Sequence, residues 1–406
     1  MAPFPRFLRG SILAALVLPA LFGLDLPVGT EIQIRLKTKV STQSSRPQDA
    51  VEAFVIAPVM QTGQLAIPMG ATVRGTVAKA SQSSKGDERS VLAFSFTELE
   101  FDSTKLKIET QLAGIDNARE KLSDTGEING ILASETMSGK IDSGINKVAE
   151  RYSGFAGILG TVKKAVFATP EGDVTYDVGV EMTLKLTAAL TIKGPVGRGL
   201  ETKLQPMPDP GKLAVLVRRE PFQTTAENPP KPSDITNLML VGDLEQVKSA
   251  FKEAGWASAA SLDGWSKFQT VRALAEDRGY NEAPVSVLLL EGKPPEIVFE
   301  KLTNTFAMRH HLRVWRRDVT FQGRPVWAVA ATHDTGISFS EENRTFIHKI
   351  ESQIDRERSK VVNDLVFTGH VTSVEMVERN NIPKNAQNAT GDNLETDGKI
   401  AVLLLN

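Results

Sequence analysis

The sequence predicts two domains: an all-β small barrel with a helical insertion, and then an α+β domain with a mostly antiparallel sheet. Alternating apolar and polar residues dominate the first part of the chain, which is typical of half-buried strands. Eight prolines then crowd residues 194–234, which indicates a break between domains. After this break, patterns of helix and strand are mixed. A chain of 406 residues is long enough for two or three such domains.

The bulk composition excludes several functional classes. The net charge of −2 gives no overall attraction to nucleic acid, so we expect no nucleic-acid partner. The absence of cysteine excludes disulfides, a thiolate zinc site and a thiol nucleophile.

The first residues have the pattern of an export signal. Arg6 and Arg9 precede an uncharged, mostly apolar run at 11–22, too short for a comfortable membrane span. We expect a signal peptide over 1–23, either cleaved or retained as an interfacial anchor. The mature chain is then periplasmic or otherwise envelope-associated, with no transmembrane span.

The barrel is expected over 24–192. Ile32, Ile34 and Leu36 alternate with polar residues, and further strands follow, separated by turn-forming pairs such as Thr62-Gly63. The string LPVGTEIQIRLKTKV (26–40) is echoed by YDVGVEMTLKLTAAL (176–190), with Val-Gly-x-Glu and a basic residue before leucine in both. Between the two strings, 125–172 reads as an insertion with a helix at 145–167. A last strand that returns beside the first would remove open edges.

Four strings of this region carry a resemblance to a known family: LPVGTEIQIRL, PVMQTGQLAIPMGATVRGTV with its Ile-Pro-Met-Gly turn, LAFSFTELEFD, and YDVGVEMTLKL. The region resembles the β-rich C-terminal domain of TrbI-like proteins, which are envelope scaffolds of conjugal-transfer channels. The resemblance implies a fold and an association with the envelope and with secretion.

A proline-rich linker is expected over 193–234, and 211–219 within it could be a strand. The second domain is expected over 235–406. Asp243 should cap a helix that ends near Gly255, and Gln322-Gly323 should form the tip of a long hairpin. The remaining expected elements are strands at 237–242, 285–292 and 396–405 and helices at 266–279 and 354–365.

All five histidines fall between residues 310 and 370, in a window that is also rich in arginine and tryptophan. A two-residue hairpin turn pairs His311 with Asp334 and Arg313 with Thr332, on one face with Trp315. His310 and His333 then share the other face. A slip of one residue would rearrange both sets. The adjacent His310 and His311 point to opposite faces and cannot hold one metal together, so no metal site and no cofactor is assigned.

Candidate catalytic residues are His311 and Asp334. The candidate ligand-binding residues are Arg313, Trp315, Arg309, His310, His333, His348, Asp355 and Arg358. Three interpretations remain open: a polar network that stiffens the sheet, an anion site with tryptophan as a platform, and a site of phosphoester hydrolysis. The network interpretation is favoured, since no established catalytic motif is present.

This second domain resembles the LssY C-terminal domain family, on the strings NLMLVGDLEQVKSAFKEAGW, RHHLRVW, RPVWAVAATHDTGISFS, HKIESQIDRERSKVVNDL and TDGKIAVLLL. Members occur alone or joined to membrane modules, which implies the cell envelope and lipid-linked phosphate chemistry. The family tends to have arginine where His333 stands here, and the resemblance transfers no catalytic residue.

The sequence therefore favours a non-enzymatic, exported binding or scaffold protein that recognises an anionic ligand or a membrane-protein partner. The alternative is a hydrolase of a phosphorylated envelope or lipid-linked substrate. A third possibility is a pH-sensing domain built on His311.

Overall fold

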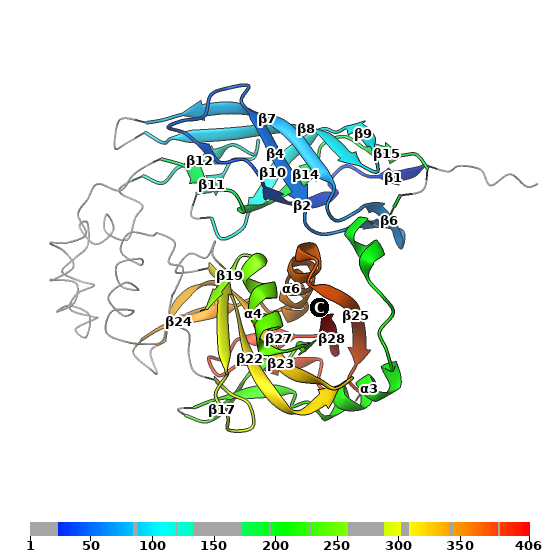
Figure 1. Ribbon diagram of the computed structural model, residues 1–406. Coiled ribbons are helices and arrows are strands. Elements are labelled where there is room, and N and C mark those ends of the chain that lie inside the picture. The colour runs from blue at the N-terminus through cyan, green and yellow to red at the C-terminus, as the bar shows by residue number, and fades with distance from the viewer. Residues whose placement is uncertain are drawn as a thin grey trace, which may run out of the picture.

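The computed structural model describes all residues except 1–22, 84–87, 119, 133–172, 195, 198, 228, 259–287, 302–307, 341–344 and 381. The expected signal peptide and the helices expected at 145–167 and 266–279 therefore lie outside the described residues. The two expected domains are present and pack on one another (Figure 1).

The N-terminal domain is a nearly closed antiparallel barrel. Its main sheet runs in the order β10-β14-β2-β4-β7-β8-β12-β11, with β9 paired to β8. Closure comes from β8 and the segment leading into β10, where Ile108 N donates to Thr97 O at 2.9 Å. The strands of this sheet are β2 (Glu31–Leu36), β4 (Ala50–Val55), β7 (Thr72–Ser81), β8 (Val91–Phe101), β9 (Thr104–Lys107), β10 (Thr110–Ile115), β11 (Lys121–Leu122), β12 (Ile128–Asn129) and β14 (Glu181–Leu186).

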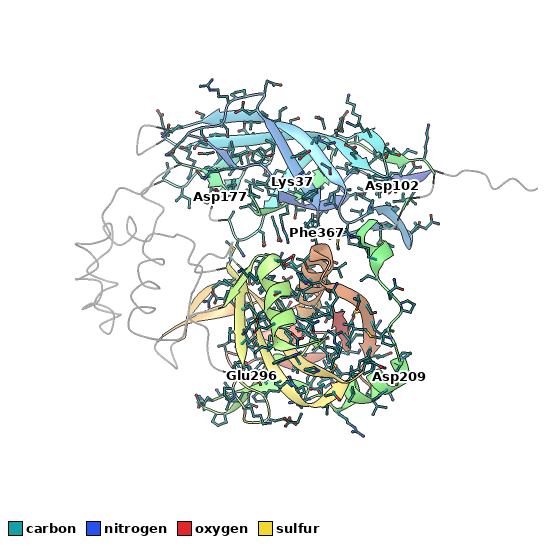
Figure 2. All side chains as sticks on the ribbon, viewed as in Figure 1. Lys37, Asp102, Asp177, Asp209, Glu296 and Phe367 are labelled. Carbon is teal, nitrogen blue, oxygen red and sulfur yellow. The ribbon has the colours of Figure 1, made fainter. Side chains whose placement is uncertain are left out.

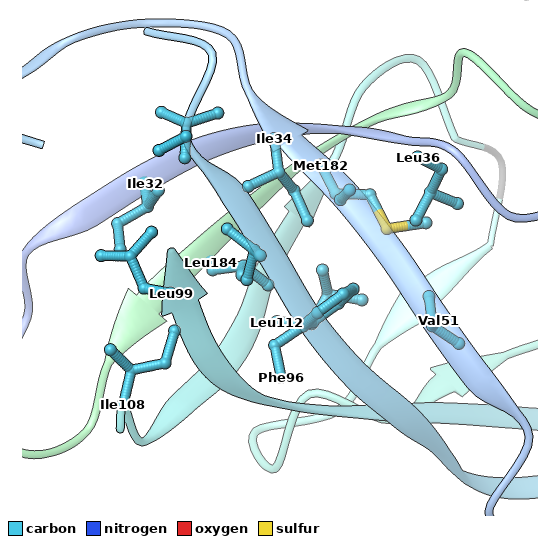
Figure 3. Packing of buried hydrophobic residues seen from close by; sticks show 14 of the residues in the cluster. Ile32, Ile34, Leu36, Val51, Phe96, Leu99, Ile108, Leu112, Met182 and Leu184 are labelled. Carbon is cyan, nitrogen blue, oxygen red and sulfur yellow. The ribbon is translucent and has the colours of Figure 1, made fainter. Parts of the chain in front are cut away.

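The barrel core is built by the alternation seen in the sequence. Ile32, Ile34 and Leu36 of β2 are fully buried, whereas Glu31 and Gln33 face outward. The buried side chains of β2 meet Leu184 of β14 and the other apolar residues of the cluster (Figure 3).

The internal echo of the sequence is a structural repeat. In the first copy β1 (Leu24–Leu26), β2 and β3 (Val40–Ser41) follow one another, and in the second β13 (Thr175–Tyr176), β14 and β15 (Leu190–Ile192) do the same. Equivalent strands pair reciprocally: β1 with β15, β13 with β3, and β2 with β14. Gly29 N donates to Leu186 O, and the equivalent Gly179 N donates to Leu36 O. The two copies are thus related by a local two-fold axis between β2 and β14. A separate hairpin of β5 (Val59–Gln61) and β6 (Gln64–Ile67) turns at Thr62-Gly63.

The C-terminal domain is built on a sheet in the order β19-β21-β22-β23-β18-β28-β25, with β24 paired to β23. All pairs are antiparallel except β18 with β28, as expected for a mostly antiparallel sheet. Its strands are β18 (Leu238–Val241), β19 (Trp256–Ser258), β21 (Ile297–Lys301), β22 (Met308–Phe321), β23 (Arg324–Ser340), β24 (Thr345–Ile350), β25 (Val371–Glu378) and β28 (Lys399–Leu405). Two smaller sheets join β17 (Lys231–Ile235), β16 (Gln223–Ala226) and β20 (Leu288–Leu289), and β26 (Asn385–Gln387) with β27 (Asn393–Glu395).

Two helices cover one face of this sheet. α4 (Leu244–Glu253) begins at Asp243, whose side chain forms a capping box with Gln246, as the sequence predicts. α6 (Ile354–Thr368) ends at Gly369 in the left-handed conformation. Phe251 of α4 and Leu365 of α6 pack in the same buried cluster as Leu240 of β18.

The opposite face is covered by a helix that the sequence analysis misassigned. Residues 211–219, read as a possible strand, belong to α3 (Pro210–Arg219), which follows a short 3-10 helix η2 (Gly199–Lys203). Asp209 caps α3 by accepting from Lys212 N, and proline at the first position fits a helix start. Leu213 and Val217, four residues apart, are buried against Met239 of the sheet. Helices therefore cover both faces of this sheet.

The long hairpin turns where the sequence places it, but its register differs. Gln322 and Gly323 have φ of 53° and 73°, as a two-residue hairpin turn requires. An irregularity between Arg316 and Thr320 then shifts the pairing by two residues, so His311 lies opposite Thr332 and Arg309 opposite Asp334. The expected pairs His311–Asp334 and Arg313–Thr332 were wrong. The shift is even, so each side chain keeps its expected face.

The domains meet through β2, α6 and the turn before β7. Phe367 of α6 points toward the barrel (Figure 2), and its ring centroid lies 5.8 Å from that of Phe54 in β4. Met69, in the Ile-Pro-Met-Gly turn of the barrel, is buried in the core cluster of the C-terminal domain. Within the described part of the chain, no helix has the length and apolar character needed to cross a bilayer.

Candidate functional site

One face of the hairpin β22–β23 holds a charged cluster enclosed by the C-terminal domain. Asp334 accepts from Arg309 Nε at 3.2 Å and bonds to His311 Nε2 at 2.8 Å. Arg313 donates to Asp234 of β17 at 2.9 Å, and Arg309 also pairs with Glu300 at 3.4 Å. The structure thus brings together four predicted site residues, Arg309, His311, Arg313 and Asp334.

This enclosed cluster is shielded from solvent. His311, Arg313 and Asp334 are 4%, 3% and 1% exposed. Burial lowers the pKa of Arg313, against the opposing effect of Asp234 and Asp334. Trp315 on the same face is buried in an apolar cluster with Leu290 and Ala330. Among the described residues, these buried ions are paired and hydrogen-bonded with one another.

The other face of the hairpin points toward the barrel. The rings of His310 and His333, directly paired across the strands, are stacked with centroids 4.0 Å apart and an interplanar angle of 10°. His310 Nδ1 bonds to Glu357 of α6 at 2.7 Å. Its Nε2 bonds at 2.8 Å to Asp116, which follows β10 of the barrel. His333 Nε2 lies 3.3 Å from Oδ1 of the neighbouring Asn117.

The two carboxylates change the proton affinity of His310. Burial lowers its pKa, but Asp116 and Glu357 outweigh burial and raise the pKa to about 10. Burial raises the pKa of Asp116. His310 and Lys360 together lower this pKa by more, so it lies well below its usual value. A protonated His310 therefore bridges the two domains at neutral pH.

Two predicted residues lie elsewhere. Arg358 on α6 donates to Asp355 at 3.0 Å and to Asp397 at 2.8 and 2.9 Å, near the start of β28. These two residues fasten α6 to the last segment of the chain. It is Glu357, between them, that reaches His310. His348 is on β24, paired with Ile337, and its side chain lies outside the described part.

A second charged cluster, which the sequence analysis missed, lies between the domains. We call it the interface cluster; it consists of Arg35 and Glu181 of the barrel and Lys301, Lys360 and Asp364 of the C-terminal domain. Glu181 pairs with Arg35 at 2.7 Å, with Lys301 at 3.1 Å, and with Lys360. Asp364 pairs with Arg35 at 2.7 Å and with Lys301 at 2.6 Å.

The interface cluster is nearly dry. The side chains of Lys301 and Asp364 are each 2% exposed, and that of Glu181 is 5% exposed. Burial raises the pKa of Glu181, but Lys301, Lys360 and Arg35 together hold it well below its usual value. Asp364 also accepts from Trp256 Nε1 at 3.0 Å. Three cations and two anions thus pair with one another at the domain boundary.

A signal for this cluster was present in the sequence. Glu181 is the glutamate of the second Val-Gly-x-Glu motif, and Arg35 is the basic residue before leucine in the first copy. These two positions face each other in the register of β2 and β14. Their partners Lys301, Lys360 and Asp364 belong to the other domain, and no spacing along the chain links them to the repeat.

Two surface cavities lie apart from these clusters. One lies beside α3 and β22 and is lined by residues that include Leu216, Arg316 and Val319. The other lies at one end of the barrel, between Gln111 of β10 and Lys185 of β14. Neither is lined by a residue of the enclosed or interface cluster.

Comparison with known proteins places the C-terminal domain. Residues 217–400 match the family model described as LssY C-terminus. No curated protein matches. Among solved structures, ComB10 of the Com type IV secretion system of Helicobacter pylori aligns at 15% identity over 44% of this chain and 95% of that chain. Its TM-score of 0.24 is too low to carry an argument, so the TrbI-like resemblance of the barrel rests on its sequence motifs. Residues 217–400, a little under half of the chain, are thus similar to the LssY C-terminus family.

Proposed function

We propose that this chain is an exported, envelope-associated scaffold, in which the barrel and the LssY-type domain act as one rigid unit that binds a protein partner. The observation that carries the proposal is the charge pairing within the two clusters. Arg309 and Arg313, which were candidates for binding an anion, form ion pairs with carboxylates of the same chain. The charges thus serve to fix elements to one another.

Ligand binding at the enclosed cluster would be costly. An anion at Arg309 or Arg313 would have to displace Asp334 or Asp234 and leave a buried carboxylate without its cation. Separating one partner from a buried ion pair costs about 3–5 kcal/mol. We therefore favour a protein partner over a small anionic ligand.

The interface cluster supports the rigid unit. Its side chains are anchored on β2, β14, β21 and α6, so a rotation of one domain against the other would separate several buried ion pairs at once. Domains of one chain commonly move relative to one another when the interface between them is small and polar. A fixed arrangement is useful to a scaffold, whose partners must be held at defined positions.

The alternative, a hydrolase of phosphorylated envelope substrates, requires an accessible acid–base group. His311 contacts Arg313 and Asp334, but all three residues are buried. Hydrolysis remains the competing hypothesis, and measurable hydrolytic activity would favour it over the scaffold hypothesis.

The test uses the full chain, expressed in its native host and followed by envelope fractionation and native electrophoresis after mild chemical cross-linking. We expect the chain in the envelope fraction, in a complex larger than the free chain. Glu181→Ala should reduce the complex, because it opens the domain interface. The matched variant Glu31→Ala should not, because Glu31 is the exposed equivalent in the other repeat copy.

Two results would overturn the proposal. One is a free, monomeric chain in every fraction. The other is hydrolysis of p-nitrophenyl phosphate by the purified chain that His311→Gln abolishes without lowering the melting temperature. Such a loss of activity in a folded variant would make the hydrolase hypothesis the better description.

A further inference from the structure

We propose that His310, His333 and Asp116 form a site for a divalent transition metal of the zinc class, which joins the barrel to the LssY-type domain. One ligand atom from each of these residues lies within 4.8 Å of the other two. The histidines come from β22 and β23, and the aspartate comes from the loop after β10.

Both histidines are oriented as metal ligands are in proteins. His310 Nδ1 faces Glu357 at 2.7 Å, and His333 Nδ1 faces Glu351 at 3.5 Å. Each carboxylate can hold a proton on Nδ1. A metal would then take the place of the proton that His310 Nε2 shares with Asp116, because metal binding releases protons from its ligands. Both Nε2 atoms point to the same barrel loop, one toward Asp116 and one toward Asn117. The rings are stacked and nearly parallel, so their Nε2 lone pairs run side by side, and binding one ion requires one imidazole to rotate about its side-chain torsions.

The barrel loop supplies the oxygen donors. Asp116 Oδ1 lies 2.8 Å from His310 Nε2, and among the described residues Asp116 Oδ2 is buried without a hydrogen bond, with Lys360 at 3.7 Å. Asn117 Oδ1 faces the same space and could occupy a fourth position, which a water could also fill. Asn117 adopts φ of 54°, a conformation that asparagine tolerates better than most residues.

Besides the rotation of one ring, the Asp116–His310 spacing requires an adjustment. A tetrahedral metal with bonds of about 2.0–2.1 Å separates its ligand atoms by roughly 3.3 Å. The Asp116 carboxylate would therefore retreat from His310 by about 0.5 Å, exchanging a hydrogen bond for a metal bond. Asp116 is on a loop, where such a shift moves no strand.

The donor set selects the class of ion. Two imidazole nitrogens and one carboxylate suit zinc and its neighbours copper, nickel and iron, whereas calcium and magnesium prefer oxygen alone. No metal was assigned from the sequence because the adjacent His310 and His311 should point to opposite faces of the hairpin. In the structure they do point to opposite faces. The second imidazole comes instead from His333, which the hairpin places directly opposite His310.

The test is a metal titration of the untagged full chain, with Zn²⁺ followed by calorimetry and Co²⁺ followed by its visible absorption. We expect one tight equivalent in the wild type, with the intense bands of a four-coordinate cobalt site. His333→Gln and Asp116→Asn should each weaken binding by at least about tenfold, since even the loss of an outer-shell partner costs 10–100-fold. Zinc should raise the melting temperature of the wild type but not of these variants.

The matched control is His370→Gln. His370 pairs with Glu253 on another side of the domain, so its loss removes a histidine without touching the site. Circular dichroism of metal-free samples identifies variants that fold, and two different ligand variants guard against a failure of one. Equal binding by wild type, His333→Gln and Asp116→Asn would overturn the proposal, as would the absence of a stoichiometric site in the wild type.

Discussion

The two ends of the β2–β14 strand pair carry equivalent residues in opposite environments. At one end Arg35 lies opposite Glu181, and at the other Lys185 lies opposite Glu31. The repeat relates Arg35 to Lys185 and Glu181 to Glu31. The first end is buried against the C-terminal domain, whereas Glu31 and Lys185 are exposed. The comparison shows that the repeat supplies the charges, and that docking of the second domain decides which of them become part of a core.

The largest expected effect comes from removing the buried glutamate. Glu181→Ala leaves Lys301, Lys360 and Arg35 with one fewer anion among them, and we expect a loss of about 3–5 kcal/mol in the free energy of unfolding. Glu31→Ala should change it by less than about 0.5 kcal/mol. Urea unfolding of both variants measures the difference. Equal effects of the two substitutions would mean that the ion pairs of the interface cluster do not form in solution.

The next largest effect is expected in the enclosed cluster, which lies within one domain, whereas the interface cluster lies between the two domains. Arg313→Ala leaves Asp234 with no arginine at 2.9 Å, and we expect a loss of about 3 kcal/mol confined to the C-terminal domain. Hydrogen exchange should show weaker protection of β17 and β22 with unchanged barrel strands. Protection lost in both domains would show that the enclosed cluster also supports the barrel.

Acid should act on the buried end of the strand pair. The pKa of Glu181 is lowered in the folded protein, so its stabilising contribution is complete above the ordinary value of 4.5 and is lost as pH falls toward the folded value. The wild type should therefore lose stability below about pH 4.5 more steeply than Glu181→Gln. Melting temperatures of both proteins between pH 3 and 7 measure this; parallel curves would contradict the assignment.

The smallest effect comes from exchanging the basic residues of the two copies. Arg35 donates from its guanidinium to Glu181 and Asp364 together, a geometry that lysine cannot reproduce. We expect Arg35→Lys to cost about 1–2 kcal/mol, in the range of charged hydrogen bonds. Lys185→Arg, the reverse exchange on the exposed side, should be neutral within about 0.5 kcal/mol, and denaturation midpoints compare the two.

Local patterns predicted much of the fold. The alternation in β2, the capping box at Asp243 and the turn at Gln322-Gly323 each depend on residues a few positions apart, and all three are present. Helix α3 was missed because five of its residues, from Leu213 to Val217, are apolar and read equally well as a short strand. The cap at Asp209 and the proline after it were the signals that distinguish the two.

The candidate site was predicted in its residues but only partly in its contacts. The two faces of the hairpin were assigned correctly, because a shift of two residues preserves the alternation. The irregularity that causes the shift has no mark in the sequence pattern. Asp116, Glu181 and Glu357 could not be found, because their roles depend on how two domains dock, which no periodicity along one chain records.

The reciprocal pairing of the repeat also governs the order in which the barrel can form. β1 and β2 are near the start of the domain, yet their partners β15 and β14 are its last strands. Contacts between such distant segments form late and slow folding, because the intervening chain must first be brought together. A nascent chain that stops before residue 173 therefore presents β2 with one hydrogen-bonding edge open, and open edges recruit other strands. During synthesis, this edge is the part of the barrel where protection by a chaperone would matter most.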